Sequence, residues 1–208
     1  MSGGHHKMKR QIEIGVPAGT IILSVAAFML APAAYAHVGV GQPAGFMRGF
    51  MHPLGGFDHV LAMVAVGLWA AQRGGRALWL IPGTFVTIMT LGGLAATQGF
   101  AVPFVEQGIA LSVLVLGVLV AIAARWPLPV SMLIVGAFAL FHGHSHGTEM
   151  PTSVSGMEYG AGFVLATSLL HAIGVAAGSL TRGFDRNLLV RLWGSAIAAG
   201  GVYLLLAT

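Results

Sequence analysis

The chain alternates between long apolar runs and short polar interruptions. After residue 50, apolar runs are separated by brief connections that contain Gly, Pro or Arg. A helix needs about 20 apolar residues to cross the hydrocarbon core of a bilayer, because it rises about 1.5 Å per residue. The pattern therefore predicts six membrane-spanning helices, at residues 53–72, 77–98, 103–124, 128–147, 157–180 and 187–207.

The first apolar run has the features of a signal peptide. A positive stretch at residues 7–10 precedes an apolar run at 16–30 and the small-residue triplet Ala-Tyr-Ala at 34–36. We therefore expect residues 1–36 to be a signal peptide that is cleaved after Ala36, and residues 37–208 to form one membrane domain. The alternative is that this segment is an uncleaved first transmembrane helix.

Basic residues in the predicted connections fall on one side of the membrane. They are Arg73, Arg76, Arg125, Arg182, Arg186 and Arg191. The other side carries one arginine, Arg48, and three glutamates at or near the segment ends. The positive-inside rule places the arginine-bearing loops in the cytoplasm. An exported mature N-terminus followed by six crossings gives the same orientation, with both mature termini outside.

Composition excludes a soluble domain and a nucleic-acid partner. The chain is 56% hydrophobic and 8% charged, whereas soluble domains carry about a quarter charged residues. The fold class is therefore an all-α bundle in a lipid bilayer. The net charge is +4, but lysines and arginines stand singly and form no basic patch for a polyanion. There is no cysteine, so a metal ion can be bound only by His, Asp, Glu, Met or backbone groups.

Glycines at helical spacing predict close contacts between helices. The fifth predicted helix contains the pairs Gly156-x3-Gly160 and Gly174-x3-Gly178. Small residues four apart let two membrane helices approach closely. Such packing also lets side chains from several helices converge.

The first predicted helix begins with the polar sequence "HPLGGFDH". Pro53 suits the first turn of a helix, which would leave His52 at or near the N-cap. His52 and His59 are seven residues apart, so about 10 Å separates them along a regular helix. One ion could be bound by both only if residues 55–56 distort the helix. Asp58 lies at a depth where an unpaired carboxylate is costly and is usually functional.

The fourth predicted helix ends in "FHGHSHGTE". His142 and His146 are four residues apart and Glu149 follows three residues later, so a continuous helix places them on one face. These donors suit a divalent transition metal. His144 would point away, unless the adjacent glycines unwind the helix end and bring it into the site. The alternative is an exposed His-rich loop that binds metals adventitiously.

The two polar clusters lie at similar predicted depths in the membrane. Counted from the outer helix ends, His59 and His142 both lie roughly 9–10 Å below the surface, so we expect them to face each other inside the bundle. His171 lies roughly 20 Å deep. It is either an inner position on an ion path or a lone buried histidine bonded to a neighbouring backbone group. After cleavage, His37 would offer an amine and an imidazole for an outer capture site.

These motifs resemble the HupE/UreJ family of nickel permeases. Its members carry a His-x5-Asp-His motif in the first membrane helix and an FHGxAHGxE-like motif in the fourth, and the resemblance extends over the signal peptide and the six-helix layout. It implies secondary transport of Ni²⁺ at the bacterial inner membrane, associated with hydrogenase or urease maturation. Ser145 replaces a small apolar residue of the family, and we expect no effect on ligation. The positions that the match implies are His52, Asp58, His59, His142, His146 and Glu149, with His144 at the variable position.

We therefore expect a permease for Ni²⁺ or Co²⁺, with mature N- and C-termini in the periplasm. The chain lacks the GxxxxGK[ST] motif of an ATPase, and neither enzymatic activity nor a prosthetic group is expected. Two alternatives remain open. One is an intramembrane zinc hydrolase with a His-rich site. The other is a metal-binding membrane protein without transport. The sequence leaves the oligomeric state open, a homo-oligomer included.

Overall fold

The computed structural model describes residues 45–181 and 186–208. The signal-peptide prediction and His37 lie outside this part of the chain. All regular secondary structure in the described part is helical, which confirms the predicted all-α class. The helices are α2 (Gly45–Gly55), α3 (Phe57–Arg73), α4 (Ala77–Thr97), α5 (Val105–Ala121), α6 (Leu128–Glu149), α7 (Gly156–Leu180) and α8 (Arg186–Ala207).

The start of the first predicted helix was wrong. His52 and Pro53 belong to the last turn of α2, whereas α3 begins only at Phe57. Gly56 separates the two helices in an extended conformation (φ −94°, ψ 115°), and their axes differ by 82°. Pro53 therefore does not open α3, and His52 is not its N-cap. The other five predicted segments each coincide with one helix, α4 to α8.

Four of these helices are long and apolar enough to span a membrane: α4, α6, α7 and residues 188–207 of α8. The bent pair α2–α3 meets the criterion when its two parts are taken together, and α5 is apolar but has 17 residues. Large apolar side chains are exposed on the outside of the bundle, among them Trp79 (80%), Leu133 (73%) and Leu206 (84%). An apolar exterior of this kind suits a multi-pass membrane protein. The number of crossings stays a prediction.

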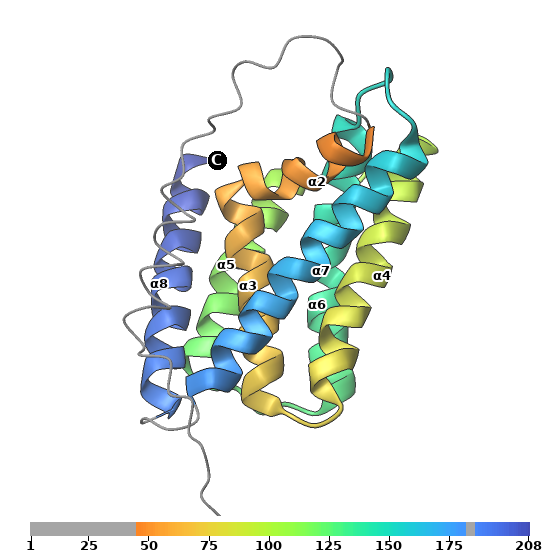
Figure 1. Cartoon of the computed structure of the whole chain (residues 1–208). Coiled ribbons are helices and arrows are strands. Elements are labelled where there is room, and N and C mark those ends of the chain that lie inside the picture. Colours follow the sequence, from red (N-terminus) through yellow and green to blue (C-terminus); the bar gives the residue numbers. More distant parts are fainter. Residues whose placement is uncertain (1–44, 182–185) are drawn as a thin grey trace, which may run out of the picture. The chain divides into compact units, whose positions relative to one another are not determined.

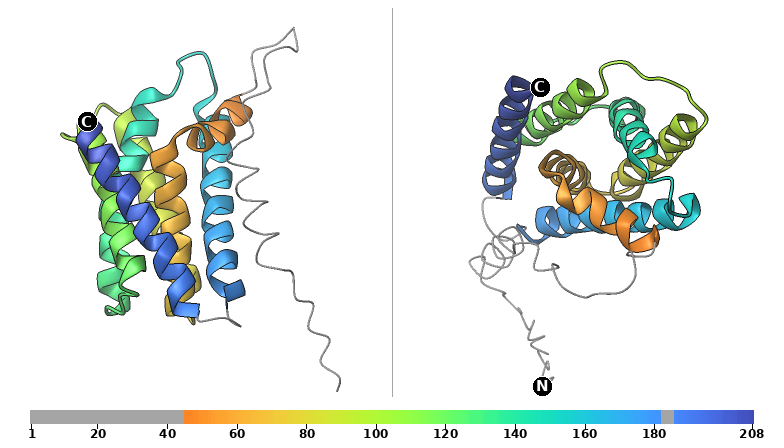
Figure 2. Two further views of the ribbon diagram at one scale, coloured as in Figure 1. Left: turned by 90° about the vertical axis from the view of Figure 1, so that its left-hand side faces the viewer. Right: turned by 90° about the horizontal axis from the view of Figure 1, so that it is seen from above.

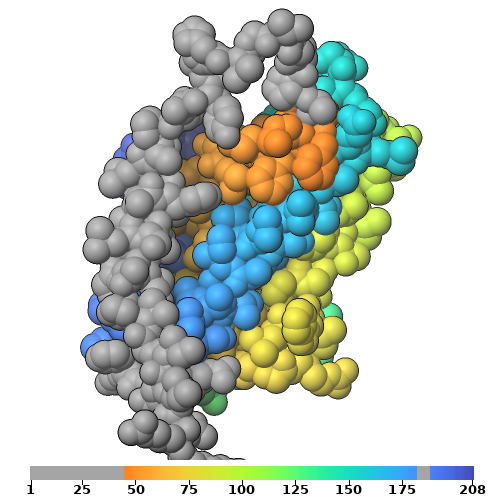
Figure 3. Space-filling view, viewed as in Figure 1, coloured from red at the N-terminus to blue at the C-terminus, as the bar shows by residue number. Residues whose placement is uncertain are grey.

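Helix α3 lies in the middle of the bundle. Helices α4, α5, α7 and α8 pack around it (Figure 2). Its sequence after Phe57 is dominated by small and apolar residues, and most of them are buried on every side. Helix α2 crosses the end of the bundle and packs on the first part of α7 (Figures 1 and 3). We call this the α2 end.

Glycines allow the closest contact of α3, which is with α7. A Cβ atom at Gly67 would collide with the backbone of α7, and one at Gly174 would collide with the backbone of α3. Gly178 packs against Ala71, so the predicted contact through Gly174 and Gly178 is confirmed. The same prediction for Gly156 and Gly160 was wrong. A Cβ at Gly160 would meet nothing within 4 Å, and one at Gly156 would touch only a flexible methionine side chain.

The end opposite α2 carries the α3–α4 and α5–α6 connections (Figure 1). We call it the arginine end, because Arg73, Arg76 and Arg125 lie there. Helix α5 ends here at Ala121, and carbonyl groups in its last turn and in the residues just after it need donors from outside the helix. Trp69, Gln72 and Arg191 donate to the carbonyls of Ala124, Val120 and Ala121, at 2.9, 2.9 and 2.7 Å.

The half of the bundle near the arginine end has a largely apolar interior. Its largest buried side chains come from α3, α4 and α5, and all are at most 1% exposed: Leu68, Trp69, Ile81, Leu116 and Val120. The half near the α2 end instead buries four histidines, His59, His142, His144 and His146. Polarity therefore changes sharply along the bundle axis, and the candidate chemistry is confined to one half.

Candidate metal centre

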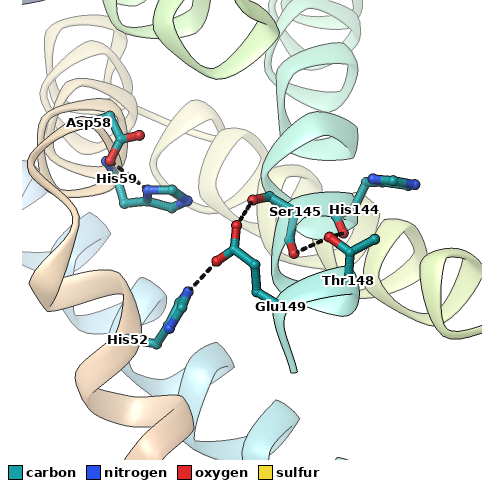
Figure 4. Close-up of polar contacts among 7 residues, drawn as sticks. All are labelled: His52, Asp58, His59, His144, Ser145, Thr148 and Glu149. Atoms are coloured by element: carbon teal, nitrogen blue, oxygen red, sulfur yellow. Dashed lines mark hydrogen bonds and ion pairs between the residues drawn. The ribbon is translucent and has the colours of Figure 1, made fainter. Parts of the chain in front are cut away.

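Three side chains from two helices converge at the α2 end. His52 comes from α2, and His146 and Glu149 come from α6. One potential ligand atom from each lies within 4.8 Å of the others. His52 Nε2 and Glu149 Oε2 are 3.0 Å apart (Figure 4). Imidazole and carboxylate groups are ligands for late first-row divalent metals. We call this group the outer cluster.

The outer cluster is open to solvent on one side only. The side chains of His52 and Glu149 are 34% and 47% exposed, whereas His146 is 3% exposed and has no hydrogen-bond partner among the described residues. An ion arriving from solvent therefore meets an exposed carboxylate and imidazole first. A buried imidazole lies directly behind them.

Ser145 holds the carboxylate of this cluster. Its hydroxyl donates to Glu149 Oε1 at 2.6 Å, which leaves Oε2 facing His52 (Figure 4). A second-shell hydrogen bond of this kind orients a metal ligand and tunes its affinity. This contact argues against the expectation that Ser145 is neutral for ligation.

Asp58 fixes the orientation of His59. Asp58 Oδ1 accepts from the backbone N–H of His59 at 2.8 Å and lies 2.7 Å from its Nδ1 (Figure 4). A carboxylate accepts, so Nδ1 carries the proton and Nε2 keeps its lone pair. Nε2 is buried and has no partner among the described residues. The lone pair on Nε2 of His59 is therefore available to bind a metal. This arrangement is common for ligating histidines.

Ser112 gives His142 a defined tautomer in the same way. The Ser112 hydroxyl donates to the carbonyl of Ile109 at 2.6 Å, and its oxygen lies 2.9 Å from His142 Nε2. Since a serine has one hydroxyl proton, Nε2 of His142 is the donor in the second contact. Nδ1 of His142 then carries a lone pair, and it has no partner among the described residues.

The four imidazoles form a continuous line from solvent into the bundle. Ring centroids are 4.7 Å apart for His52 and His146, 4.4 Å for His146 and His59, and 4.8 Å for His59 and His142. His142, the last in the line, is fully buried. The prediction that His59 and His142 face each other is confirmed. The alternative of an exposed loop is wrong, since α6 continues to Glu149.

The glycines of "FHGHSHGTE" serve packing. A Cβ at Gly143 would collide with the backbone of Met89, and one at Gly147 with the backbone of Gly93, both on α4. The end of α6 is therefore a regular helix pressed against α4, and the proposed unwinding was wrong. His144 points away from the outer cluster (Figure 4). Its Nε2 lies 2.8 Å from the carbonyl of Phe100.

The remaining histidine candidate is not part of the outer cluster. His171, on α7, is 2% exposed and lies against the ring of Phe85. Of the two alternatives for His171, the one with a bond to a neighbouring backbone group was wrong, because neither ring nitrogen has a partner in the described chain.

Sequence reasoning missed several side chains that shape the site. Tyr159 and Phe163 of α7 form its wall, with ring centroids 6.0 Å from His52 and 3.9 Å from His146. Neither belongs to a polar motif, so no local signal identified them. Ser112 could have been identified from the sequence, because it is the single polar side chain in the apolar run at residues 108–121.

Comparison with known proteins gives a consistent result over nearly the whole chain. The sequence profile of the family described as HupE / UreJ protein matches residues 25–204. A protein named Protein HupE, from Rhizobium leguminosarum bv. viciae, is 45% identical over 185 residues, which cover 89% of this chain and 96% of that protein. No solved structure matches the chain.

Proposed function

Because the chain belongs to the HupE/UreJ family, we propose that it is a secondary transporter that imports Ni²⁺, or Co²⁺, across the bacterial inner membrane. The observation that carries this proposal is the line of four imidazoles that starts at the half-exposed outer cluster and ends at the buried His142. A binding site that only stores metal does not need ligands that continue into the bundle.

The outer cluster has the chemistry for reversible capture. Two imidazoles and one carboxylate supply three donors, which leaves coordination positions for water or for the next ligand. An incomplete shell of nitrogen and oxygen donors releases an ion more readily than a closed thiolate cage does. His146 belongs to the cluster and also touches His59, so it can bind the ion at both stages.

The next step uses the histidines with fixed tautomers. His59 Nε2 and His142 Nδ1 have lone pairs because Asp58 and Ser112 bind the opposite ring nitrogens. The negative charge of Asp58, transmitted through this hydrogen bond, makes His59 a better ligand. The ion therefore moves from an exposed carboxylate to buried neutral imidazoles without meeting a wholly apolar gap.

The orientation follows from charge. The outer cluster lies at the α2 end, and the arginine connections lie at the opposite end. With the arginine end in the cytoplasm by the positive-inside rule, the cluster faces the periplasm. Transport would then deliver metal to the cytoplasm, where hydrogenase or urease maturation uses it. The chain has no ATPase motif, so uptake is downhill or coupled to another ion.

Metal flux tests the proposal. Purified full-length protein in proteoliposomes should take up Ni²⁺ with saturable kinetics, and H59A and H146A should lower the rate by at least about tenfold. L133A is the matched control, because Leu133 is 73% exposed on the outside of the bundle. Competition with Co²⁺, Zn²⁺ and Cu²⁺ then ranks the metals.

Two results would overturn the proposal. One is tight binding of metal without flux, which would identify a storage or sensing protein. The other is hydrolysis of a peptide by the zinc-loaded protein without any flux, which would support the intramembrane hydrolase.

A further inference from the structure

His171 is an isolated imidazole in the middle of the bundle. It is 2% exposed, and neither of its ring nitrogens has a hydrogen-bond partner among the described residues. A buried polar group without a partner costs several kcal/mol in surroundings that contain no water. No hydrogen bond among the described residues offsets this cost, which points to a ligand that binds His171.

The face of α7 that carries His171 begins at the outer cluster. Tyr159, Phe163, Thr167 and His171 follow at steps of four residues, and all four are buried. Residues four apart lie on one side of a helix. Tyr159 and Phe163 line the outer cluster, and His171 lies about 12 Å further along the axis than Phe163. This face therefore leads from the cluster to His171.

His142 connects the two levels. His142 and His171 both pack on the ring of Phe85, with centroid distances of 5.5 and 5.2 Å. His142 Nδ1 has no partner among the described residues. A soft thioether ligand lies next to the same face of α7, one turn before His171, since the hydroxyl of Thr167 lies 3.7 Å from the sulfur of the buried Met89. Imidazole nitrogen with thioether sulfur suits late first-row ions and does not suit Mg²⁺ or Ca²⁺.

We propose that His171 is a second, inner binding position for a late first-row divalent metal, which it receives from His142. The inference rests on the transport function proposed above and adds a site to it. Below His171, toward the arginine end, the interior is largely apolar, and its buried polar side chains among the described residues are the hydroxyls of Ser131 and Thr181. His171 is therefore the last imidazole ligand that an ion meets before the closed half of the bundle.

A variant that keeps volume and removes the ligand tests this position. H171F should lower Ni²⁺ uptake into proteoliposomes by at least about tenfold. Equilibrium binding of Ni²⁺ to the outer cluster, measured in detergent, should stay within about twofold of the unmodified protein, because the cluster does not contact His171. Uptake by folded H171F at the unmodified rate would overturn the proposal.

A cysteine reporter tests binding without relying on flux, and it also covers the case in which H171F does not fold. The chain has no cysteine, so in H171C a thiolate-to-metal charge-transfer band after addition of Ni²⁺ or Cd²⁺ can arise only at this position. L170C is the matched control, since Leu170 is equally buried and lies one residue earlier on the helix.

A band in H171C and none in L170C supports the inner position. Absence of the band in H171C, or equal bands in both variants, overturns it. The proposed function is tested separately by flux in the unmodified protein. A band in H171C together with no flux would therefore retain the inner site and reject transport.

Discussion

At the scale of single residues, the site depends on hydrogen bonds that orient ligands. Three side chains each hold one ligand group in place: Asp58 holds His59, Ser112 holds His142 and Ser145 holds Glu149. Orienting partners of this kind commonly change metal affinity by about 10-fold to 100-fold when they are removed. The motif residues are therefore only part of the ligand set.

Ser145 offers the cleanest test at this scale. S145A removes the bond to Glu149 and should weaken Ni²⁺ binding by about tenfold while the protein stays folded. Isothermal titration in detergent measures this. T148A is the control, because the Thr148 hydroxyl bonds only to the backbone carbonyls of His144 and Ser145. Equal affinity of S145A and the unmodified protein would show that Glu149 needs no positioning.

At the scale of elements, the bend between α2 and α3 makes the outer cluster possible. A straight helix would hold His52 and His59 about 10 Å apart along its axis. The 82° bend instead brings His52 over the end of α6, where it meets His146, which in turn meets His59. Gly56, at the bend, leaves space for the Asp58–His59 pair, which a side chain at this position would crowd.

Alanine at the two glycines of this bend should have different effects. A Cβ at Gly56 would lie 2.8 Å from both Asp58 Oδ1 and His59 Nδ1, whereas a Cβ at Gly55 would meet nothing within 4 Å. G56A should therefore displace the Asp58–His59 pair and lower Ni²⁺ uptake by about tenfold or more. G55A should retain the unmodified rate. Equal rates for the two variants in the same assay would contradict this account.

The arginine end depends on side chains that satisfy carbonyl groups in the last turn of α5 and in the residues just after it. W69F removes the donor to Ala124 from a buried position and should lower the free energy of unfolding by about 1–3 kcal/mol. Denaturation in mixed detergent micelles measures the change. W79F is the control, since Trp79 is 80% exposed, and a similar loss in both variants would argue against the hydrogen bond as the cause.

At the scale of the whole molecule, much of the fold could be predicted from the sequence. The apolar runs predicted α4 to α8 within a few residues, because the length of an apolar run can be read directly from the sequence. The α2–α3 break was considered only as a distortion at residues 55–56 and was not predicted as a helix boundary, since Pro53 is equally typical of the first turn of one helix and the last turn of another. The pairing of His59 with His142 followed from depth alone.

Other parts of the site could not be predicted because they depend on neighbours distant in sequence. The sequence does not show that Gly143 lies against the backbone of Met89, so that glycine looked like a point of flexibility. Ser112 touches His142 across 30 positions of the chain, and only the packing of α5 on α6 reveals the contact. Tyr159 and Phe163 became part of the site through their place on α7.

The orientation in the membrane can be tested with single cysteines, since the chain has none. Thr152 and Arg125 are exposed at opposite ends of the bundle. T152C in spheroplasts should react with a membrane-impermeant thiol reagent. R125C should react only after the cells are permeabilised. The reverse pattern would place the outer cluster in the cytoplasm and exclude import through it.

The buried interior of the bundle also has an electrical consequence. Solvent reaches His52 and Glu149, so the voltage across the membrane falls over the buried interior beyond them, which includes the layer around Trp69 and Ile81. A charge that crosses 100 mV gains about 2.3 kcal/mol, so a divalent ion gains about 4.6 kcal/mol. A potassium diffusion potential, negative inside, should therefore accelerate Ni²⁺ uptake into proteoliposomes. An uptake rate that does not change with voltage would mean that another charge moves with the ion and compensates its own. The field would do this work on the ion beyond the outer cluster, along the buried part of its path.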